Sequence, residues 1–210
     1  MLSIVLLRHG KTACNIENRY NGKIDEPLSP QGIAQAQAQA HYPEIPRVYA
    51  SPMLRAQQTA KIFFPNARIV TVDDLREMDF GDFEGRTAAE MERDEAYNAW
   101  IEGGCVDDCP NGEGIPGFAA RASAAFAGCV ADAIDRGEPR VGVAVHGGVI
   151  MAVMSAFSGS DALYHAWYVD NCGGYEIEID EAAWAREKRF ASYRLFGRLG
   201  AHKDIIGAER

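Results

Sequence analysis

Two short apolar runs, each ending in a histidine followed by glycine, constrain the fold of this chain more than any other feature. They are residues 3–8 (SIVLLR, before His9) and 140–146 (RVGVAVH). A continuous apolar run is typical of a strand whose two faces are both covered, as in a parallel sheet. Covering both faces requires helices on each side, so the runs indicate an α/β protein.

Weaker strand candidates and several helical segments lie around these two runs. The strand candidates are residues 47–51, 68–72, 174–180 and 192–197. The helical segments are residues 30–41, 53–64, 86–102, 116–136 and 147–157. Ser29-Pro30 and Ser51-Pro52 resemble helix starts, because serine caps the first turn and proline suits its first position. The alternation predicts a three-layer α/β/α sandwich with a mostly parallel central sheet.

The length of 210 residues fits a single domain over residues 1–210. The stretch 78–117 is longer than a plain crossover between a strand and a helix. It is rich in Asp, Glu, Gly and Cys, and we expect it to form a small cap insertion over the functional site. Residues 200–210 are polar, so we expect them to fray.

Charge and hydropathy exclude two classes of partner. The net charge of −9 predicts repulsion from nucleic acid and from anionic membrane surfaces, so an anionic ligand would need a local cluster of positive charge. We find no continuous apolar stretch near the ~18 residues of a membrane span. The N-terminus also lacks a basic stretch before its apolar run, as an export signal would have. We therefore expect neither nucleic acid nor a membrane as a partner.

The cysteines favour a reducing compartment. There are five, an odd number, and no export signal precedes them, so we expect a cytoplasmic protein. Cys105 and Cys109 form a single C-x3-C pair with no second pair and no histidine nearby. This spacing does not support a zinc site.

The two strand-end histidines predict a shared site. In an open α/β sheet, ligands bind beyond the carboxyl ends of the strands. If the two strands are neighbours, His9 and His146 meet in one crevice, and Arg8 adds positive charge to it. A helix that begins at Gly147 would direct its positive end at an anion there. The alternative is that each is an ordinary histidine at a strand end, but two such sites, one preceded by arginine, favour a shared anion site.

Two other motif matches do not carry chemistry. Residues 112–117 fit G-x-G-x-x-G literally, but loop-type residues precede them and Pro116 lies inside, so they lack the strand and helix of a dinucleotide fingerprint. Cys14 is separated from Arg19 by four residues and follows Ala13. A cysteine-based phosphatase needs five intervening residues and a preceding histidine. The sequence also contains no Walker-type phosphate loop.

Five sequence blocks, taken in order, resemble the histidine phosphatase superfamily, also called the phosphoglycerate mutase-like family. The blocks are LLRHGKTACN, RYNGKIDEPLSPQG, SPMLRAQQTA, LREMDFGDFEG and VAVHGG, and they extend from residue 4 to about residue 150. RHG alone would be weak evidence, whereas five blocks in the family's order are not expected by chance. The resemblance implies the α/β/α fold and phosphoryl transfer through a phosphohistidine.

The resemblance also implies a role for five residues. His9 matches the nucleophile, whose attacking nitrogen must be unprotonated, so its other nitrogen should donate to an acceptor. Arg8 and Arg55 match the phosphate clamps, because guanidinium groups bind phosphate oxygens bidentately. His146 matches the second histidine, which donates to the transferring phosphoryl group. Glu77 matches the proton donor, which needs a raised pKa.

Further contacts and absences follow from the same match. Asn15, Asn21 and Gly22 match secondary phosphate contacts, and Gly147 adds the helix start. We expect the other acidic residues of the Glu77 block to lie at the surface; they are Asp79, Asp82 and Glu84. Arginines beside the histidines would repel a cation, so we expect no metal and no cofactor.

Three functions are compatible with these residues. The first is a phosphomonoesterase acting on a small phosphorylated metabolite, similar to α-ribazole phosphatases and to broad-specificity phosphatases. The second is a cofactor-dependent phosphoglycerate mutase, but those enzymes resemble RHGES-x-WN at the first block and carry longer insertions. The third is a non-catalytic binding protein on the same fold, which the intact set of five key residues disfavours.

Overall fold

The computed structural model, described here for residues 1–39 and 41–197, contains a six-stranded sheet in the order β3-β2-β4-β1-β5-β6. Its strands are β1 (Leu2–Arg8), β2 (Arg47–Ala50), β3 (Arg68–Thr71), β4 (Arg140–Val145), β5 (Gly174–Ile179) and β6 (Ser192–Phe196). Neighbours from β3 to β1 pair in parallel, and β5 pairs antiparallel with both β1 and β6. The prediction of a mostly parallel sheet is confirmed. Residues 200–210, expected to fray, lie outside the described residues.

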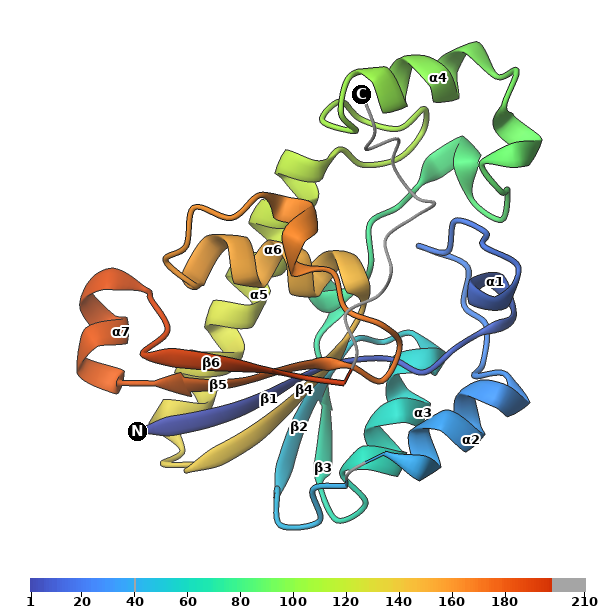
Figure 1. Cartoon of the computed structure of the whole chain (residues 1–210). Coiled ribbons are helices and arrows are strands. Elements are labelled where there is room, and N and C mark those ends of the chain that lie inside the picture. The colour runs from blue at the N-terminus through green and yellow to red at the C-terminus, as the bar shows by residue number, and fades with distance from the viewer. Residues whose placement is uncertain (40, 198–210) are drawn as a thin grey trace.

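Helices cover both faces of this sheet. The helices of the described residues are α1 (Ala13–Ile16), α2 (Pro30–Ala38), α3 (Leu54–Phe63), α4 (Glu95–Glu102), α5 (Ile115–Asp135), α6 (Gly147–Phe157) and α7 (Glu181–Glu187), and four of them cover the sheet. In Figure 1, α2 and α3 lie on one side of the sheet and α5 and α6 on the other. Along β1, Leu6 packs into the cluster shared with α5 and α6, whereas Leu7 packs into the cluster shared with α2 and α3. The first apolar run is therefore buried on both faces, as predicted.

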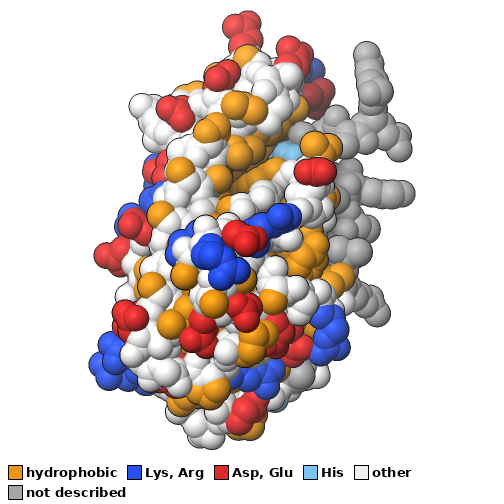
Figure 2. All heavy atoms as spheres, turned by 90° about the vertical axis from the view of Figure 1, so that its left-hand side faces the viewer, with side chains coloured by type: hydrophobic (Ala, Val, Ile, Leu, Met, Phe, Trp, Pro, Cys, Tyr) orange, Lys and Arg blue, Asp and Glu red, His pale blue; other side chains and the backbone are white. Residues whose placement is uncertain are grey.

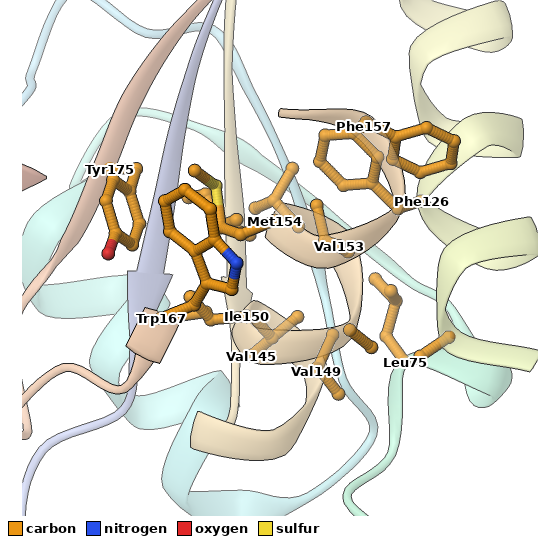
Figure 3. Packing of buried hydrophobic residues seen from close by; sticks show 14 of the residues in the cluster. Leu75, Phe126, Val145, Val149, Ile150, Val153, Met154, Phe157, Trp167 and Tyr175 are labelled. Carbon is orange, nitrogen blue, oxygen red and sulfur yellow. The ribbon is translucent and has the colours of Figure 1, made fainter. Parts of the chain in front are cut away.

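Helix α6 is fixed between α5 and the sheet. Figure 3 shows its buried side chains flanked by two aromatic pairs. Phe126 of α5 stacks on Phe157 with ring centroids 5.9 Å apart, and Trp167 meets Tyr175 of β5 edge-on at 6.0 Å. Because this packing sets the position of α6, it also sets the position of His146, which is the N-cap of that helix.

The segment between β3 and α5, residues 72–114, departs from the prediction. We predicted one helix over residues 86–102, and this is wrong: a 3-10 turn at Ala89–Met91 is followed by α4. The side chain of Asp94 accepts from the backbone N–H of Tyr97 at 3.2 Å and starts a new helix there. The amphipathic pattern hid this local cap, which interrupts the helix before α4.

Helix α5 has the length and apolar composition of a membrane span when these are taken alone. In the fold, its apolar residues have a different explanation. Phe118, Phe126 and Val130 are fully buried in the cluster that α5 shares with α6. Core packing therefore accounts for these large apolar side chains of the helix.

Candidate active site

The two strand-end histidines meet, as the sequence predicted for neighbouring strands. Strands β1 and β4 are adjacent and parallel, with Arg8 opposite Val145 in the register. The rings of His9 and His146 then lie edge to face, with centroids 5.1 Å apart. Both side chains are buried. The carboxyl ends of these strands therefore form one site, as in other open α/β sheets.

The geometry around His9 fixes its tautomer. Nδ1 lies 2.7 Å from the carbonyl oxygen of Gly10. A carbonyl oxygen can only accept, so Nδ1 must carry the proton and Nε2 keeps its lone pair. Burial is the main reason that the pKa of His9 is lowered, and the charges of Arg55 and Arg8 lower it further. His9 is thus a neutral imidazole with a free Nε2.

His146 has protein partners at both of its nitrogens. Nε2 lies 2.7 Å from the hydroxyl of Ser51, at the end of β2, and Nδ1 accepts from Nε of Arg55 at 3.3 Å. Burial and the charge of Arg55 lower the pKa of His146. Sequence reasoning treated Ser51 only as a helix cap, so its contact with His146 is an addition to the site.

Arg55 is fully buried, and its hydrogen bonds to the described residues go to His146 and to backbone carbonyl groups. Nη1 donates to the carbonyl of Ile24 at 2.7 Å, and Nη2 donates to the carbonyls of Gly22 at 2.8 Å and Asn21 at 3.3 Å. Burial lowers the pKa of Arg55, but a guanidinium keeps its charge at any working pH. Carbonyl dipoles hold the group in place without cancelling its charge.

Arg8 is positioned by a separate set of contacts. Nη1 donates to the carbonyl of Val169 at 2.7 Å, and the guanidinium lies over the ring of Tyr168, 4.9 Å from its centroid. Nε is buried and has no hydrogen-bond partner among the described residues. Within the described chain, neither Arg8 nor Arg55 forms a salt bridge. Together they supply the local positive charge that an acidic protein needs to bind an anion.

Glu77 enters the site from the loop after β3. Its carboxylate accepts from the backbone N–H of Gly148 at 2.9 Å and of Met78 at 3.0 Å. Burial raises the pKa of Glu77, although these donors and the two arginines pull it down. A Cβ atom at Gly148 would overlap the carboxylate, so any larger residue at this position would displace the Glu77 side chain. The helix start of α6 therefore contacts both His146 and Glu77.

A half-buried ion pair between Arg121 and Glu113 holds the Glu77 loop, and sequence reasoning missed it. Arg121 of α5 binds both carboxylate oxygens of Glu113, at 3.0 and 2.7 Å, and donates to the carbonyl of Asp74 at 2.9 Å. Glu113 in turn accepts from the backbone N–H of Asp79 at 3.0 Å. The pair therefore binds the loop on both sides of Glu77. Nothing in the local sequence distinguishes Arg121 from other helix arginines, because the contact spans distant segments.

The predicted secondary contacts divide into two groups. Asn15, Asn21 and Gly147 line the same pocket as His9. The side chain of Asn15 accepts from the side chain of Asn171 at 3.2 Å, and Asn171 also donates to the carbonyl of His9 at 3.0 Å. Asn171 is a further residue that the sequence did not indicate, since it follows no strand-end motif.

Gly22 lies behind the pocket instead of in its lining. Its N–H donates to Glu84, and its carbonyl accepts from Arg55, as described above. Asn21 donates from Nδ2 to Thr12 at 3.2 Å and to Glu26 at 2.9 Å, while its buried Oδ1 has no partner among the described residues.

The acidic residues beside Glu77 behave differently from one another. Asp82 is exposed, as expected, whereas Asp79 and Glu84 are half-buried. Glu84 accepts from the backbone N–H groups of Lys23 and Phe80, in addition to Gly22. The expectation that Glu84 is a surface residue is wrong, because its carboxylate joins the loop after α1 to the Glu77 loop.

The pocket above His9 has a polar floor and an apolar wall. The floor is made by Arg8, His9, Asn15, Asn21, Glu77, Gly147 and Gly148. The wall is made mainly by Tyr20, Met78, Phe80, Trp100, Ile115, Phe118, Met151, Tyr164 and Tyr168. Arg55 and His146 are fully buried behind the floor. Among the described residues there is no group of three or more His, Cys, Asp or Glu side chains that could hold a metal ion.

Comparison with known proteins agrees with this geometry. The model of the histidine phosphatase superfamily (branch 1) matches residues 4–191. The chain is 27% identical over 202 residues to the adenosylcobalamin/α-ribazole phosphatase of Escherichia coli (strain K12), covering 90% of this chain and 93% of that one. It is 30% identical over 192 residues to GpmB of Enterobacter sp. (strain 638), named as a phosphoglycerate mutase, covering 88% of both.

Solved structures of related proteins have the same fold as this chain. A crystal structure from Escherichia coli K-12, described as an α-ribazole-5′-phosphate phosphatase, has a TM-score of 0.77 at 26% identity and covers 99% of both chains. The chain belongs to the histidine phosphatase superfamily, as its five sequence blocks predicted. Within that superfamily it is a phosphatase-type enzyme with the phosphoglycerate mutase-like fold.

Proposed function

We propose that this enzyme is a phosphomonoesterase that transfers the phosphoryl group of a small ester to Nε2 of His9 and then to water. The observation that carries the proposal is the state of His9. Its Nδ1–H is held by the carbonyl of Gly10, and its pKa is lowered by burial and by the charges of Arg55 and Arg8, which form no ion pair with the described residues. A neutral, oriented imidazole beside fixed positive charge is what attack on a phosphate monoester requires.

In the first half-reaction, Nε2 of His9 attacks phosphorus as the bond to the ester oxygen breaks. Glu77, whose pKa is raised by burial, acts as the general acid: it gives a proton to that oxygen, and the alcohol leaves. The positive charge that develops on the imidazole is delocalised over the ring, whose Nδ1–H stays hydrogen-bonded to the carbonyl of Gly10. The products of this step are a free alcohol, phosphohistidine and a Glu77 carboxylate.

In the second half-reaction, a water molecule takes the place of the alcohol. The Glu77 carboxylate removes a proton from the water, whose oxygen attacks phosphorus and displaces Nε2. Inorganic phosphate leaves, and Glu77 and His9 return to their starting states. One carboxyl group serves both steps because its hydrogen bonds to Gly148 and Met78 hold it at the same place.

Arg8, Arg55 and His146 stabilise the charge that spreads over the transferring oxygens. The contact between Nε of Arg55 and Nδ1 of His146 is long, at 3.3 Å. We propose that a phosphoryl oxygen replaces it. With the hydroxyl of Ser51 donating to Nε2, His146 would carry its proton on Nδ1 and donate to that oxygen beside Arg55.

We propose that residues 1–210 form one domain and that the region 78–117 acts as its cap. In support, Phe80, Trp100, Cys105 and Ile115 of that region line the pocket above His9. Figure 1 shows α4 standing away from the sheet, on the side where the chain crosses from β3 to α5.

We also propose that the enzyme is cytoplasmic and that its partner is a small phosphate ester. All five cysteines are free and buried, which suits a reducing compartment. The net charge of −9 supports neither nucleic acid nor an anionic membrane as a partner.

The assay that tests the function measures two products at once. Purified enzyme is incubated with α-ribazole phosphate, 3-phosphoglycerate, fructose bisphosphate and phosphoserine, and inorganic phosphate is followed together with phosphoryl-isomerised product. We expect phosphate release that His9→Asn abolishes. Isomerisation of 3-phosphoglycerate without phosphate release would instead establish the mutase alternative, and no turnover with intact binding would establish the non-catalytic one.

A further inference from the structure

We infer that the alcohol part of the substrate is uncharged and carries an apolar group of about the size of a ring. This inference rests on the proposed function, because it concerns the leaving group of the same reaction. Three observations support it. The wall of the pocket is apolar, the polar atoms of three wall side chains are hydrogen-bonded within the protein, and few charged side chains line the pocket.

The wall above Glu77 is built from several segments that converge on the leaving-group side. Tyr20 follows α1, Trp100 lies on α4, Phe118 on α5 and Met151 on α6, while Tyr164 comes from the turn after α6. Figure 2 shows hydrophobic side chains gathered in a hollow on this side of the molecule, below its upper end. Aromatic and apolar surfaces of this kind gain free energy by covering an apolar group.

Three polar atoms of the aromatic wall, those of Tyr20, Trp100 and Tyr164, are already used within the protein. The hydroxyl of Tyr20 pairs with that of Tyr97 at 3.0 Å, and Nε1 of Trp100 donates to the carbonyl of Asp107 at 3.0 Å. The hydroxyl of Tyr164 donates to the carbonyl of Gly148 at 3.1 Å. These three rings therefore offer carbon faces and edges to a ligand, with their donors turned to other partners.

Besides Arg8, the lining offers a second anionic group no unpaired Lys or Arg side chain among the described residues, and, apart from His9, the other group there that can be cationic is His165. Arg8 and Arg19 are the only Lys or Arg side chains among the described residues that line it, and Arg8 lies beside His9. Arg19 is held by Glu17 at 2.7 Å and Glu90 at 2.8 Å, and it also donates to the carbonyl of Gly85. A carboxylate or a second phosphate on the substrate would lose water without gaining an unpaired cation.

This arrangement discriminates among phosphate esters. Phosphoglycerates, sugar bisphosphates and phosphoserine each carry a further charged group, which the wall does not match. Polyols carry hydroxyl groups that would lose their hydrogen bonds to water against carbon surfaces. A neutral alcohol bearing an aromatic or aliphatic ring fits both the floor and the wall.

The test compares three alkyl esters in which leaving-group activation is similar: 3-phenylpropyl phosphate, glycerol 1-phosphate and 3-phosphoglycerate. We expect kcat/KM for the phenylpropyl ester to exceed that for the glycerol ester by roughly ten-fold or more, as expected for burial of a ring. The phosphoglycerate should be the poorest of the three. Equal values, or a preference for either polar ester, would overturn the inference.

Two substitutions in the wall sharpen the comparison. Met151→Gln and Ile115→Asn place an amide where a half-buried apolar side chain now lines the pocket. Each should lower the ratio of phenylpropyl to glycerol kcat/KM by about ten-fold. Ile33→Gln, on partly exposed α2 and outside the pocket lining, is the matched control and should leave the ratio unchanged. Unchanged ratios in both wall variants would contradict the inference, and the wild-type series decides it if a variant does not fold.

The outcomes separate this inference from the proposed function. If 4-nitrophenyl phosphate and all three alkyl esters release no phosphate, the proposed function is wrong and the inference falls with it. If phosphate is released through His9 but a charged or polyol ester is preferred, only the inferred substrate class is wrong.

Discussion

The edge of one buried imidazole faces the other: His9 and His146 lie with their ring planes at 65° and their centroids 5.1 Å apart. Burial and two nearby arginines hold the pKa of each ring well below 6.5. The folded protein therefore keeps two neutral imidazoles in a region of positive potential. This arrangement favours binding of an anion, and it has a measurable consequence for stability.

Stability should fall on the acid side, and part of the fall should belong to His9. Below about pH 6.5 the unfolded chain takes up protons on its histidines, whereas the folded protein does not, so the free energy of unfolding decreases as pH falls. Glu77 contributes to this pH dependence with the opposite sign. Because its pKa is raised, the folded state binds a proton at Glu77 before the unfolded state does as pH falls. Substituting His9 therefore isolates the contribution of this one imidazole to the pH dependence of the unfolding free energy.

Urea unfolding of wild type and His9→Asn between about pH 7 and about pH 5 measures this contribution. We expect the slope of the unfolding free energy with pH to be steeper in wild type by about 1 kcal/mol per pH unit. Parallel slopes would mean that His9 is protonated in the folded state, and they would remove the basis for a neutral nucleophile.

Glu77→Gln should slow the first step most for esters with poor leaving groups. Glutamine keeps the shape but cannot protonate the leaving oxygen, and general acid catalysis contributes about 100- to 10,000-fold. An aryl phosphate leaves as a weak base, so its transfer to His9 should be less affected and a burst should precede slow dephosphorylation. Single-turnover rates with one alkyl and one aryl ester separate the cases. Equal losses for both would transfer the acid role to another carboxylate, with Asp79 or Asp82 tested first.

Arg121→Met should act through Glu77. Loss of the contacts to Glu113 and to the carbonyl of Asp74 frees the loop that carries the acid, and displacement of a catalytic group by a small distance costs about ten- to a hundred-fold. The alkyl ester should lose more than the aryl ester, as for Glu77→Gln. Arg136→Met, which breaks an exposed ion pair on the same helix, is the control and should leave both rates unchanged. A uniform loss for both esters in Arg121→Met would indicate a general structural defect instead.

Activity should survive removal of divalent metal ions. The positive charge beside His9 comes from Arg8 and Arg55, which need no ion to fill that role. Dialysis against a chelator, followed by assay in metal-free buffer, should leave kcat/KM unchanged. A loss that magnesium, zinc or manganese restores would contradict this expectation.

The parts of the fold that follow from local pattern were predictable from the sequence. The apolar runs of β1 and β4 predicted buried strands. The His-Gly pair after each run predicted that His9 and His146 lie at the same edge of the sheet, where the parallel strands end. Pro30 at the start of α2 marked that helix because it removes a donor that would have no partner anyway. Such signals depend on residues close in sequence, so a single chain reveals them.

The parts that depend on contacts between distant segments were not predictable. Glu84 binds backbone amides far away in the chain instead of lying in water. The Asp94 cap of α4 is a local contact, but the amphipathic pattern over residues 86–102 concealed it. Ser51 and Arg121 join the site through side chains that meet His146 and the Glu77 loop only in the folded state. Ser51 lies in the SPMLRAQQTA block, but the block does not reveal its contact with His146. Arg121 has no motif of its own, because one arginine on a helix resembles another until its partners are known.

The central claim is that His9 carries the phosphoryl group between the ester and water. The most direct measurement is brief incubation with an ester labelled in its phosphoryl group, followed by an alkaline quench, because phosphohistidine is labile in acid, and by peptide mapping. The account predicts label on His9 in wild type, accumulation of that label in Glu77→Gln with an aryl ester, and no label or turnover in His9→Asn. Turnover at the wild-type rate in His9→Asn, with no label on His9 in wild type, would contradict it.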